Sequence, residues 1–221
     1  MVNPDKIFGR LSNRMFQMAT LYTYCRDNNY PIFVQDEKYF KKYENEIRQL
    51  YGDGIDQRNK GYVGIHVRRA KNPINPQEPA YSENPFYANL SHHLHEDMSD
   101  NYYVRGMDYF KKLNPNLKFK VYSDDIDWCS KQEIFKDCDF SRYEWGYDLE
   151  KGTRELISGS EIEDMNEMAS CEHNIIANSS FSWWAAWLNP NPNKIVVAPK
   201  QWFASKENEQ FIGIPNTWIR I

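Results

Sequence analysis

The sequence predicts an α/β fold in which helices cover both faces of a mainly parallel sheet. Short, continuously apolar segments alternate with helical patterns over residues 61–200. Strands that are apolar on both faces are typical of parallel sheets, because crossover helices bury each face. Polar and charged residues directly follow several of these segments, and sheets of this kind bind ligands at the carboxyl ends of their strands.

The first part of the chain predicts a short α/β segment. An apolar strand leads through Gly9 into a helix, and a second short strand follows. Residues 36–54 favour one amphipathic helix that ends at Gly52 or Gly54. The largely polar stretch 53–61 predicts a linker. The first helix is indicated by apolar residues at the spacing of one buried face: Leu11, Met15, Met18, Ala19 and Tyr22.

The linker divides the chain into an N-terminal segment, 1–60, and a second domain, 61–221. The regular alternation in the second domain predicts a Rossmann-like sheet with helices on both faces. Its helix at 160–171 has Ser160 as the expected N-cap. The other expected elements are strands at 62–67, 117–123, 138–145, 173–178 and 194–199, a loop at 71–86, and helices at 87–113, 124–135 and 179–189.

Composition narrows the class of protein. With 221 residues, 41% of them hydrophobic and 26% charged, the chain has the balance of a globular protein. That length fits one domain, or one full domain and a partial second one. A net charge of -4 argues against a nucleic-acid binder held by phosphate neutralisation, and leaves room for a local basic site that binds one small polyanion.

The cysteines predict reduced thiols, because they are scattered and form no CxxC pair: Cys25, Cys129, Cys138 and Cys171. No apolar run reaches the length of a membrane-spanning helix. The first residues also lack the pattern of a signal peptide. We therefore expect a cytoplasmic protein, and peripheral association with a membrane stays open.

Polar residues at three strand ends predict the site. Because the carboxyl ends of parallel strands share one edge, these residues should converge. Arginine forks match phosphate oxygens, and the start of a helix offers backbone N–H groups to the same anion. The expected ligand is therefore a nucleoside diphosphate, with Asp124 or Asp125 accepting hydrogen bonds from base or ribose. The residues are His66, Arg68 and Arg69; Ser123, Asp124 and Asp125; and Asn178, Ser179 and Ser180.

Each of these features also has a purely structural interpretation. The arginine pair is typical of a surface or interdomain salt bridge, and Ser123–Asp125 is typical of an ordinary helix start. The indole side chains of Trp183, Trp184 and Trp187 are expected in the core. We expect two further sets of histidines to bind no metal: His92, His93 and His95 as solvated surface, and His173 as a structural residue.

In this order, four motifs closely resemble the α-1,2-fucosyltransferase family, which corresponds to glycosyltransferase family 11. They are "GRLSNRMFQMA", "VGIHVRR", "VYSDDIDWC" and the block from Glu161 to Phe203 that contains "NSSFSWWAAWLN". The resemblance implies a GT-B-like fold whose C-terminal domain, here 61–221, binds the donor. It also implies inverting transfer of L-fucose from GDP-fucose to the 2-hydroxyl of a terminal galactose, with no metal and no other cofactor.

The resemblance also implies roles for individual residues. Arg68 and Arg69 match the family's arginine pair and would hold the diphosphate and neutralise the departing GDP, as an oxocarbenium-like transition state requires. His66 would orient the strand end or contact the donor. The expected donor-binding set comprises Gly9, Asn13, Arg68, Ser123, Asp124, Asn178, Ser179, Ser180, Phe181 and Ser182, with Arg10 in the same N-terminal motif.

The chain departs from the family pattern after the arginines. Where the family has an aspartate, this sequence has Lys71. A lysine with an ordinary pKa is protonated at neutral pH and cannot act as a base. Glu78 and Glu83 in the following loop are candidate substitutes, and Glu78 is the one assigned a catalytic role. A dissociative reaction with weak base assistance is the alternative.

A second departure is the short stretch between the first motif and the arginine strand. Residues 18–60 are too few for a complete Rossmann domain at ordinary element lengths. The acceptor side is therefore expected to be reduced, rebuilt or supplied by a partner chain, and a homo-oligomer stays open. The expected acceptor is a galactose-terminated oligosaccharide or glycan.

Three functions follow from these patterns. The first is a GDP-fucose-dependent fucosyltransferase that acts on a galactoside. The second is a catalytically impaired relative that binds a nucleotide sugar or glycan without turnover. The third is a transferase of the same fold that uses another sugar nucleotide, because an arginine pair reads the diphosphate and not the sugar.

Overall fold

The structure is a computed structural model, and it describes residues 15–17, 19, 44–68, 100–141, 144–148, 153–158, 161–202 and 213–221. Several expectations lie outside these ranges. They are the strands of the N-terminal segment, the loop at 71–86, the first half of the helix at 87–113, and the N-cap Ser160.

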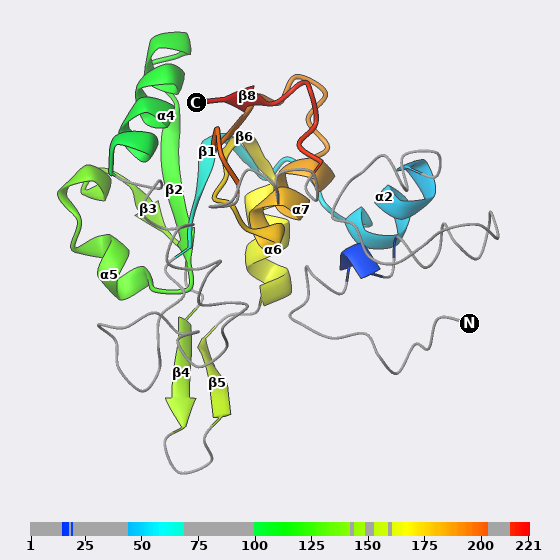
Figure 1. Cartoon of the computed structure of the whole chain (residues 1–221), viewed down its shortest axis with the longest axis horizontal. Helices are drawn as coiled ribbons and strands as arrows, with labels where there is room; N and C mark the ends of the chain where they lie inside the picture. The colour runs from blue at the N-terminus through cyan, green and yellow to red at the C-terminus, as the bar shows by residue number, and fades with distance from the viewer. Residues whose placement is uncertain are drawn as a thin grey trace.

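A six-stranded parallel sheet forms the centre of the described chain, with strand order β3-β2-β1-β6-β7-β8. The α/β class and the parallel sheet are thereby confirmed, consistent with a Rossmann-like arrangement. A separate antiparallel hairpin is formed by β4 and β5 (Figure 1). The strands are β1 Asn59–Val67, β2 Lys118–Ser123, β3 Asp139–Phe140, β4 Glu144–Asp148, β5 Thr153–Ser158, β6 Cys171–Ile175, β7 Val196–Ala198 and β8 Ile219–Arg220.

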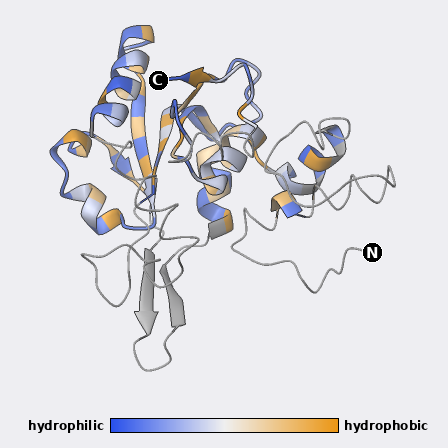
Figure 2. Cartoon of the chain, in the orientation of Figure 1, coloured by the Kyte–Doolittle hydropathy of each residue, from blue (hydrophilic) through white to orange (hydrophobic). Residues whose placement is uncertain are grey.

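Helices connect the strands and cover the sheet. The side chains of α4 pack into one hydrophobic cluster with strand residues, and those of α6 and α7 pack into a second cluster. In Figure 2, α4 carries alternating hydrophilic and hydrophobic bands, as an amphipathic helix does. The helices are α2 Glu44–Gly52, α4 Asp100–Leu113, α5 Ile126–Ser130, the short 3₁₀ helix η4 Glu133–Phe135, α6 Glu161–Ala169 and α7 Ser180–Leu188.

Strand β1 is buried on both faces. Its last five residues, 63–67, are all buried. Val63, Ile65 and Val67 belong to the cluster that contains the α4 side chains. Side chains alternate along a strand, so the residues between them face the other layer. This double burial explains why residues 62–67 are mainly apolar.

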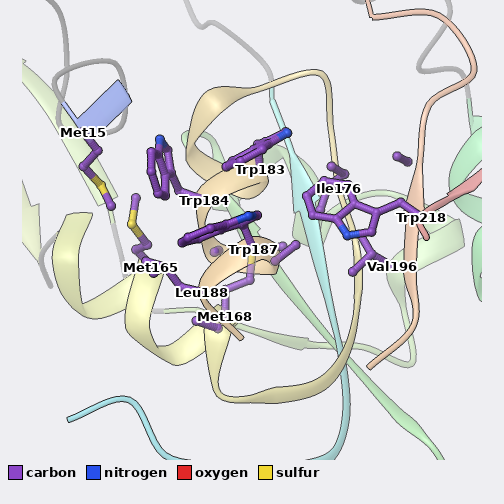
Figure 3. Close-up of a cluster of buried hydrophobic side chains, with 14 of the residues drawn as sticks. Met15, Met165, Met168, Ile176, Trp183, Trp184, Trp187, Leu188, Val196 and Trp218 are labelled. Atoms are coloured by element: carbon purple, nitrogen blue, oxygen red, sulfur yellow. The ribbon is translucent and has the colours of Figure 1, made fainter. Parts of the chain in front are cut away.

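The tryptophans of α7 form the core of the second cluster, as the sequence predicts. Trp183 and Trp184 are completely buried, and Trp187 is nearly so. In Figure 3 these rings lie between methionines on one side and Ile176, Val196 and Trp218 on the other.

Described residues of the N-terminal segment also pack into this cluster. Phe16 contacts both Trp183 and Trp184, each with a distance of 4.8 Å between ring centroids. Arg48 of α2 lies over the ring of Trp187, 3.9 Å from its centroid. The division of the chain at residue 60 stays a prediction, but these contacts show that both sides of it contribute to one core.

His173 is a structural residue, as expected. It lies within β6, stacked on Phe110 with 5.1 Å between ring centroids. Its Nδ1 accepts a hydrogen bond of 3.1 Å from the backbone N–H of Ile195. Burial lowers the pKa of His173, which favours the neutral ring that this hydrogen bond requires.

Several predicted elements differ from those observed. Strand β1 begins at Asn59, inside the predicted linker. The helix expected at 124–135 is interrupted after α5, because Gln132 has extended backbone angles, φ -85° and ψ 128°, and η4 begins only afterwards. This break leaves Phe135 buried against α4.

The other differences concern strands. The single strand predicted at 138–145 is two elements, β3 and the start of β4. Strand β6 begins and ends earlier than predicted, at Cys171 and Ile175. Strands β5 and β8 were not predicted, because β5 is a polar strand of a hairpin and β8 has only two residues.

Replacing Gly64 by alanine is expected to lower the free energy of unfolding by about 1–3 kcal/mol, because the site is overpacked. An added Cβ would lie 3.2 Å from atoms of Asn174, Cys171 and Met168. Gly52→Ala is the matched control, since its added Cβ meets its nearest neighbour, Leu188, at 3.4 Å. Urea denaturation measures both variants. A Gly64→Ala protein as stable as the wild type would contradict this account of β1 packing.

The carboxyl group of Asp164 on α6 gives the chain a pH-dependent stability. Burial, reinforced by the nearby Glu167 carboxylate, raises the pKa of Asp164 to about 7. The folded chain therefore holds this proton more tightly than the unfolded chain, where the pKa is about 4. The resulting stabilisation is complete below about pH 4 and is lost as the pH rises through about 7.

Asp164→Asn, which cannot ionise, is therefore expected to be more stable than the wild type by about 2–4 kcal/mol at about pH 8, and to differ little near pH 4. Urea denaturation of both proteins over this range measures the difference. Asp108→Asn on the exposed side of α4 is the control for the change from aspartate to asparagine. A constant difference for Asp164→Asn would contradict the assignment.

Candidate functional site

The strand order reverses on either side of β1. The chain first builds β1, β2 and β3 in one direction, and then places β6, β7 and β8 on the opposite side of β1. In open parallel sheets, a crevice forms at such a reversal outside the carboxyl ends of the two strands that flank it. The carboxyl ends of β1 and β6 therefore mark the candidate site, and the residues that follow them are its first candidates.

Arg68 follows β1 directly and forms an ion pair with Asp124, which follows β2. Val67 and Ser123 are partners in the parallel register, so the next residues on the two strands are neighbours. Arg68 Nη1 donates a hydrogen bond to Asp124 Oδ2. The exposed fraction is 17% for the Arg68 side chain and 6% for that of Asp124. A largely buried ion pair therefore lies at the carboxyl edge of the sheet.

Two residues beside Asp124 stabilise the turn into α5. The hydroxyl of Ser123 accepts a hydrogen bond of 3.0 Å from the backbone N–H of Asp125. The Asp125 carboxylate accepts one of 3.3 Å from Trp128 N and caps the helix. This region therefore has the helix-start geometry expected on structural grounds, and in addition the ion pair made by Asp124.

His66 lies at the end of β1, where the strand order reverses, and contacts elements on both sides. Its ring contacts Phe181 of α7, with 5.0 Å between centroids, so β1 and the helix after β6 meet here. Its backbone carbonyl accepts a hydrogen bond of 3.2 Å from the hydroxyl of Tyr103 on α4. His66 is 5% exposed. It therefore ties the end of β1 to helices on both faces of the sheet.

The first turn of α7 lies at the same edge, because this helix follows β6. Ser179 is its N-cap residue. The hydroxyl of the buried Ser182 donates to the carbonyl oxygens of Ala177 and Ser179, each at 3.2 Å. A helix N-terminus carries partial positive charge and points backbone N–H groups at its ligand. Residues 180–182 thus direct such groups toward the site.

Asn178 connects the site to the segment after β7. Its side-chain amide donates a hydrogen bond of 3.1 Å to the backbone carbonyl of Trp202. Trp202 is buried, so this hydrogen bond fixes the chain segment that leads from β6 into α7. Asn178 lies among the predicted donor-binding residues, and its contact with Trp202 was not predicted.

The structure therefore brings together three of the predicted strand ends. The described members are His66, Arg68, Ser123, Asp124, Asp125, Asn178, Ser179, Ser180, Phe181 and Ser182. Gly9, Arg10, Asn13, Arg69, Lys71, Glu78 and Glu83 lie outside the described residues, and their roles stay predictions.

Sequence reasoning missed Tyr103 and Trp202, which support the site through a hydroxyl and a backbone carbonyl. Trp202 lies in the block that carries the family resemblance, and that was a usable signal. Tyr103 has no comparable signal, because an aromatic residue on a helix is usually a core residue.

Two features are absent from the described residues. They contain no cluster of three His, Cys, Asp or Glu side chains placed to hold a metal ion. Among them, no helix has the length and apolar character needed to cross a membrane.

Comparison with known proteins adds to this geometry. A family model described as glycosyl transferase family 11 matches residues 7–221. An alpha-1,2-colitosyltransferase of Escherichia coli is 32% identical over 203 residues, which are 86% of this chain and 61% of the relative. An O-antigen biosynthesis glycosyltransferase of Escherichia coli, WbnK, is 29% identical over 210 residues, 93% of this chain and 59% of the relative.

The chain thus spans about three fifths of the length of these curated relatives. No solved structure matches it. The family match, however, covers nearly the whole chain, including both strand-end motifs and the α7 block. The chain belongs to glycosyl transferase family 11.

Proposed function

We propose that the chain transfers L-fucose from GDP-fucose to the 2-hydroxyl of a galactoside, with inversion and without a metal ion. The observation that carries this proposal is the position of Arg68, at the carboxyl end of β1 where the strand order reverses. Family membership supports a glycosyl donor and a glycan acceptor. The name of one relative, an alpha-1,2-colitosyltransferase, supports the linkage.

The donor diphosphate would lie between Arg68 and the first turn of α7. A guanidinium presents several N–H donors in a planar fork and binds phosphate oxygens bidentately. The backbone N–H groups at the start of α7 would bind the same anion from the other side of the reversal. His66 and Phe181, whose ring centroids are 5.0 Å apart, would form the wall between them.

In the proposed reaction, the acceptor hydroxyl oxygen forms a bond to the anomeric carbon, and the bond from that carbon to the phosphate oxygen breaks. GDP leaves with the bonding electrons, and the hydroxyl proton passes to a base or to solvent. Negative charge therefore grows on the diphosphate, where Arg68 and the α7 start would stabilise it. Arg69 and Glu78, outside the described residues, keep their predicted roles as second arginine and base.

The fold we propose is GT-B-like, with residues 61–221 as the donor domain. The parallel sheet and the location of the candidate site support this proposal. Acceptor recognition would then come from the N-terminal segment or a partner chain.

A second candidate concerns the transferred sugar. The relative that is 32% identical is named a colitosyltransferase, so transfer of colitose rather than fucose is the alternative. The contacts proposed above bind the diphosphate and not the sugar, and they serve either donor equally well.

A donor panel tests the proposed function. The protein is incubated with GDP-fucose, a colitosyl donor or a UDP-sugar, each with and without lactose or another β-galactoside, and release of the nucleoside diphosphate is measured. We expect release from GDP-fucose that depends on the acceptor. Preference for the colitosyl donor would select the second candidate. Tight GDP binding with no turnover on any galactoside would contradict both, and would favour an inactive binding relative.

Arg68→Ala is expected to lower kcat/KM for the donor by about 100–1000-fold, because a preorganised charge at the leaving group is lost. Arg68→Lys should recover only part of the activity, since a lysine cannot form the bidentate fork.

Arg58→Ala is the matched control. Arg58 is 63% exposed and pairs with Asp56, near the opposite end of β1, so its loss should leave activity unchanged. Circular dichroism establishes that each variant is folded. Full activity of Arg68→Ala would remove Arg68 from the mechanism.

A further inference from the structure

Two adjacent acidic residues follow β2, and the structure distinguishes them. The Asp125 carboxylate accepts a hydrogen bond from Trp128 N and caps α5. The Asp124 carboxylate accepts one from Arg68 Nη1. From the sequence, either residue was a candidate for accepting hydrogen bonds from the base or ribose. The geometry instead connects Asp124 to the residue proposed to bind the diphosphate.

We propose that Asp124 is a positioning residue, which acts on the donor through Arg68 by holding the guanidinium at the carboxyl end of β1. This inference rests on the proposed function, in which Arg68 binds the donor diphosphate. The parallel register places the two residues on neighbouring strands directly after the paired Val67 and Ser123. Backbone structure on both sides therefore fixes the distance between them.

The energetic benefit comes from ordering Arg68 before the donor arrives. Fixing a free arginine side chain costs rotamer entropy. The ion pair with Asp124, whose side chain is 6% exposed, orders Arg68 when the chain folds. Donor binding therefore does not include this loss of entropy. Catalytic and binding groups held in place in this way are more effective than mobile ones.

An arginine that is paired with a carboxylate can also bind a second anion. A guanidinium has five N–H donors, and a carboxylate at one side of the fork leaves donors for a phosphate at another. The largely buried carboxylate requires a charged partner, because removing one member of a desolvated pair leaves the other uncompensated. The charge of Asp124, and not only its size, is therefore essential to the arrangement.

A double-mutant cycle tests the inference with two probes, inorganic pyrophosphate and GDP. Binding to the full chain is measured by calorimetry for the wild type, Asp124→Asn, Arg68→Ala and the double variant. We expect Asp124→Asn to lower the affinity for both probes about tenfold when Arg68 is present, and by less than about twofold when residue 68 is already alanine. The effects of substituting two residues that act as one unit are not additive.

Pyrophosphate discriminates between the two roles of Asp124, since it has neither base nor ribose. A loss confined to GDP, with pyrophosphate affinity unchanged, would assign Asp124 to the nucleoside and overturn the inference. Additive losses in the cycle would overturn it as well.

Two further variants separate charge from packing. Asp124→Glu keeps the carboxylate and should bind pyrophosphate more tightly than Asp124→Asn; the reverse order would show a packing role and overturn the inference. Asp127→Asn is the matched control, because Asp127 is in α5, is 65% exposed and forms an ion pair on the helix surface with Lys131. The Asp127→Asn variant should bind pyrophosphate and GDP with the affinity of the wild type.

Calorimetry of the wild type and Arg68→Ala with UDP as a third probe separates failure of this inference from failure of the proposed function. Arg68-dependent pyrophosphate binding without preference for GDP over other nucleoside diphosphates would overturn the GDP-sugar proposal and leave the role of Asp124 intact. A wild-type chain that binds no pyrophosphate would overturn the role of Asp124.

Discussion

The burial of β1 on both faces is the constraint on which the rest of the structure depends. Residues 63–67 are covered by helices from two layers. At Gly64 the side chains of α6 and β6 come so close that an added Cβ would lie 3.2 Å from atoms of Asn174, Cys171 and Met168. Because the strand order reverses at β1, this tight packing also fixes the residues at its carboxyl end, where the candidate site lies.

A buried polar network joins α6, β6 and the C-terminal end of α7. Asn174 donates to the carbonyl oxygen of Met168 at 2.9 Å, and Asn189 donates to Asn174 at 2.9 Å and to the carbonyl oxygen of Cys171 at 2.8 Å. Such a network is stable only when its members are satisfied together, and it then favours one arrangement of α6, β6 and α7. The contact of His66 with Phe181 then sets the start of α7 against the end of β1 before any ligand binds, as a preorganised anion site requires.

Periodicity was sufficient to predict the α/β class, the tryptophan core and the position of Arg68 at a strand end. It was insufficient where structure depends on partners distant in sequence. The β4–β5 hairpin was missed because its strands are polar and depend on each other. Asp124 and Asp125 are equivalent in sequence, and only the register of β1 with β2 shows that Asp124 contacts Arg68. The break between α5 and η4 likewise depends on the burial of Phe135, which no local propensity indicates.

The most direct test of the central claim, that the donor diphosphate binds where the strand order reverses, is a crystal structure of the chain with GDP. The account predicts the diphosphate at the carboxyl ends of β1 and β6, with Arg68 and the first turn of α7 within hydrogen-bonding distance of its oxygens. A nucleotide bound elsewhere, or one whose phosphates contact neither Arg68 nor α7, would contradict the account.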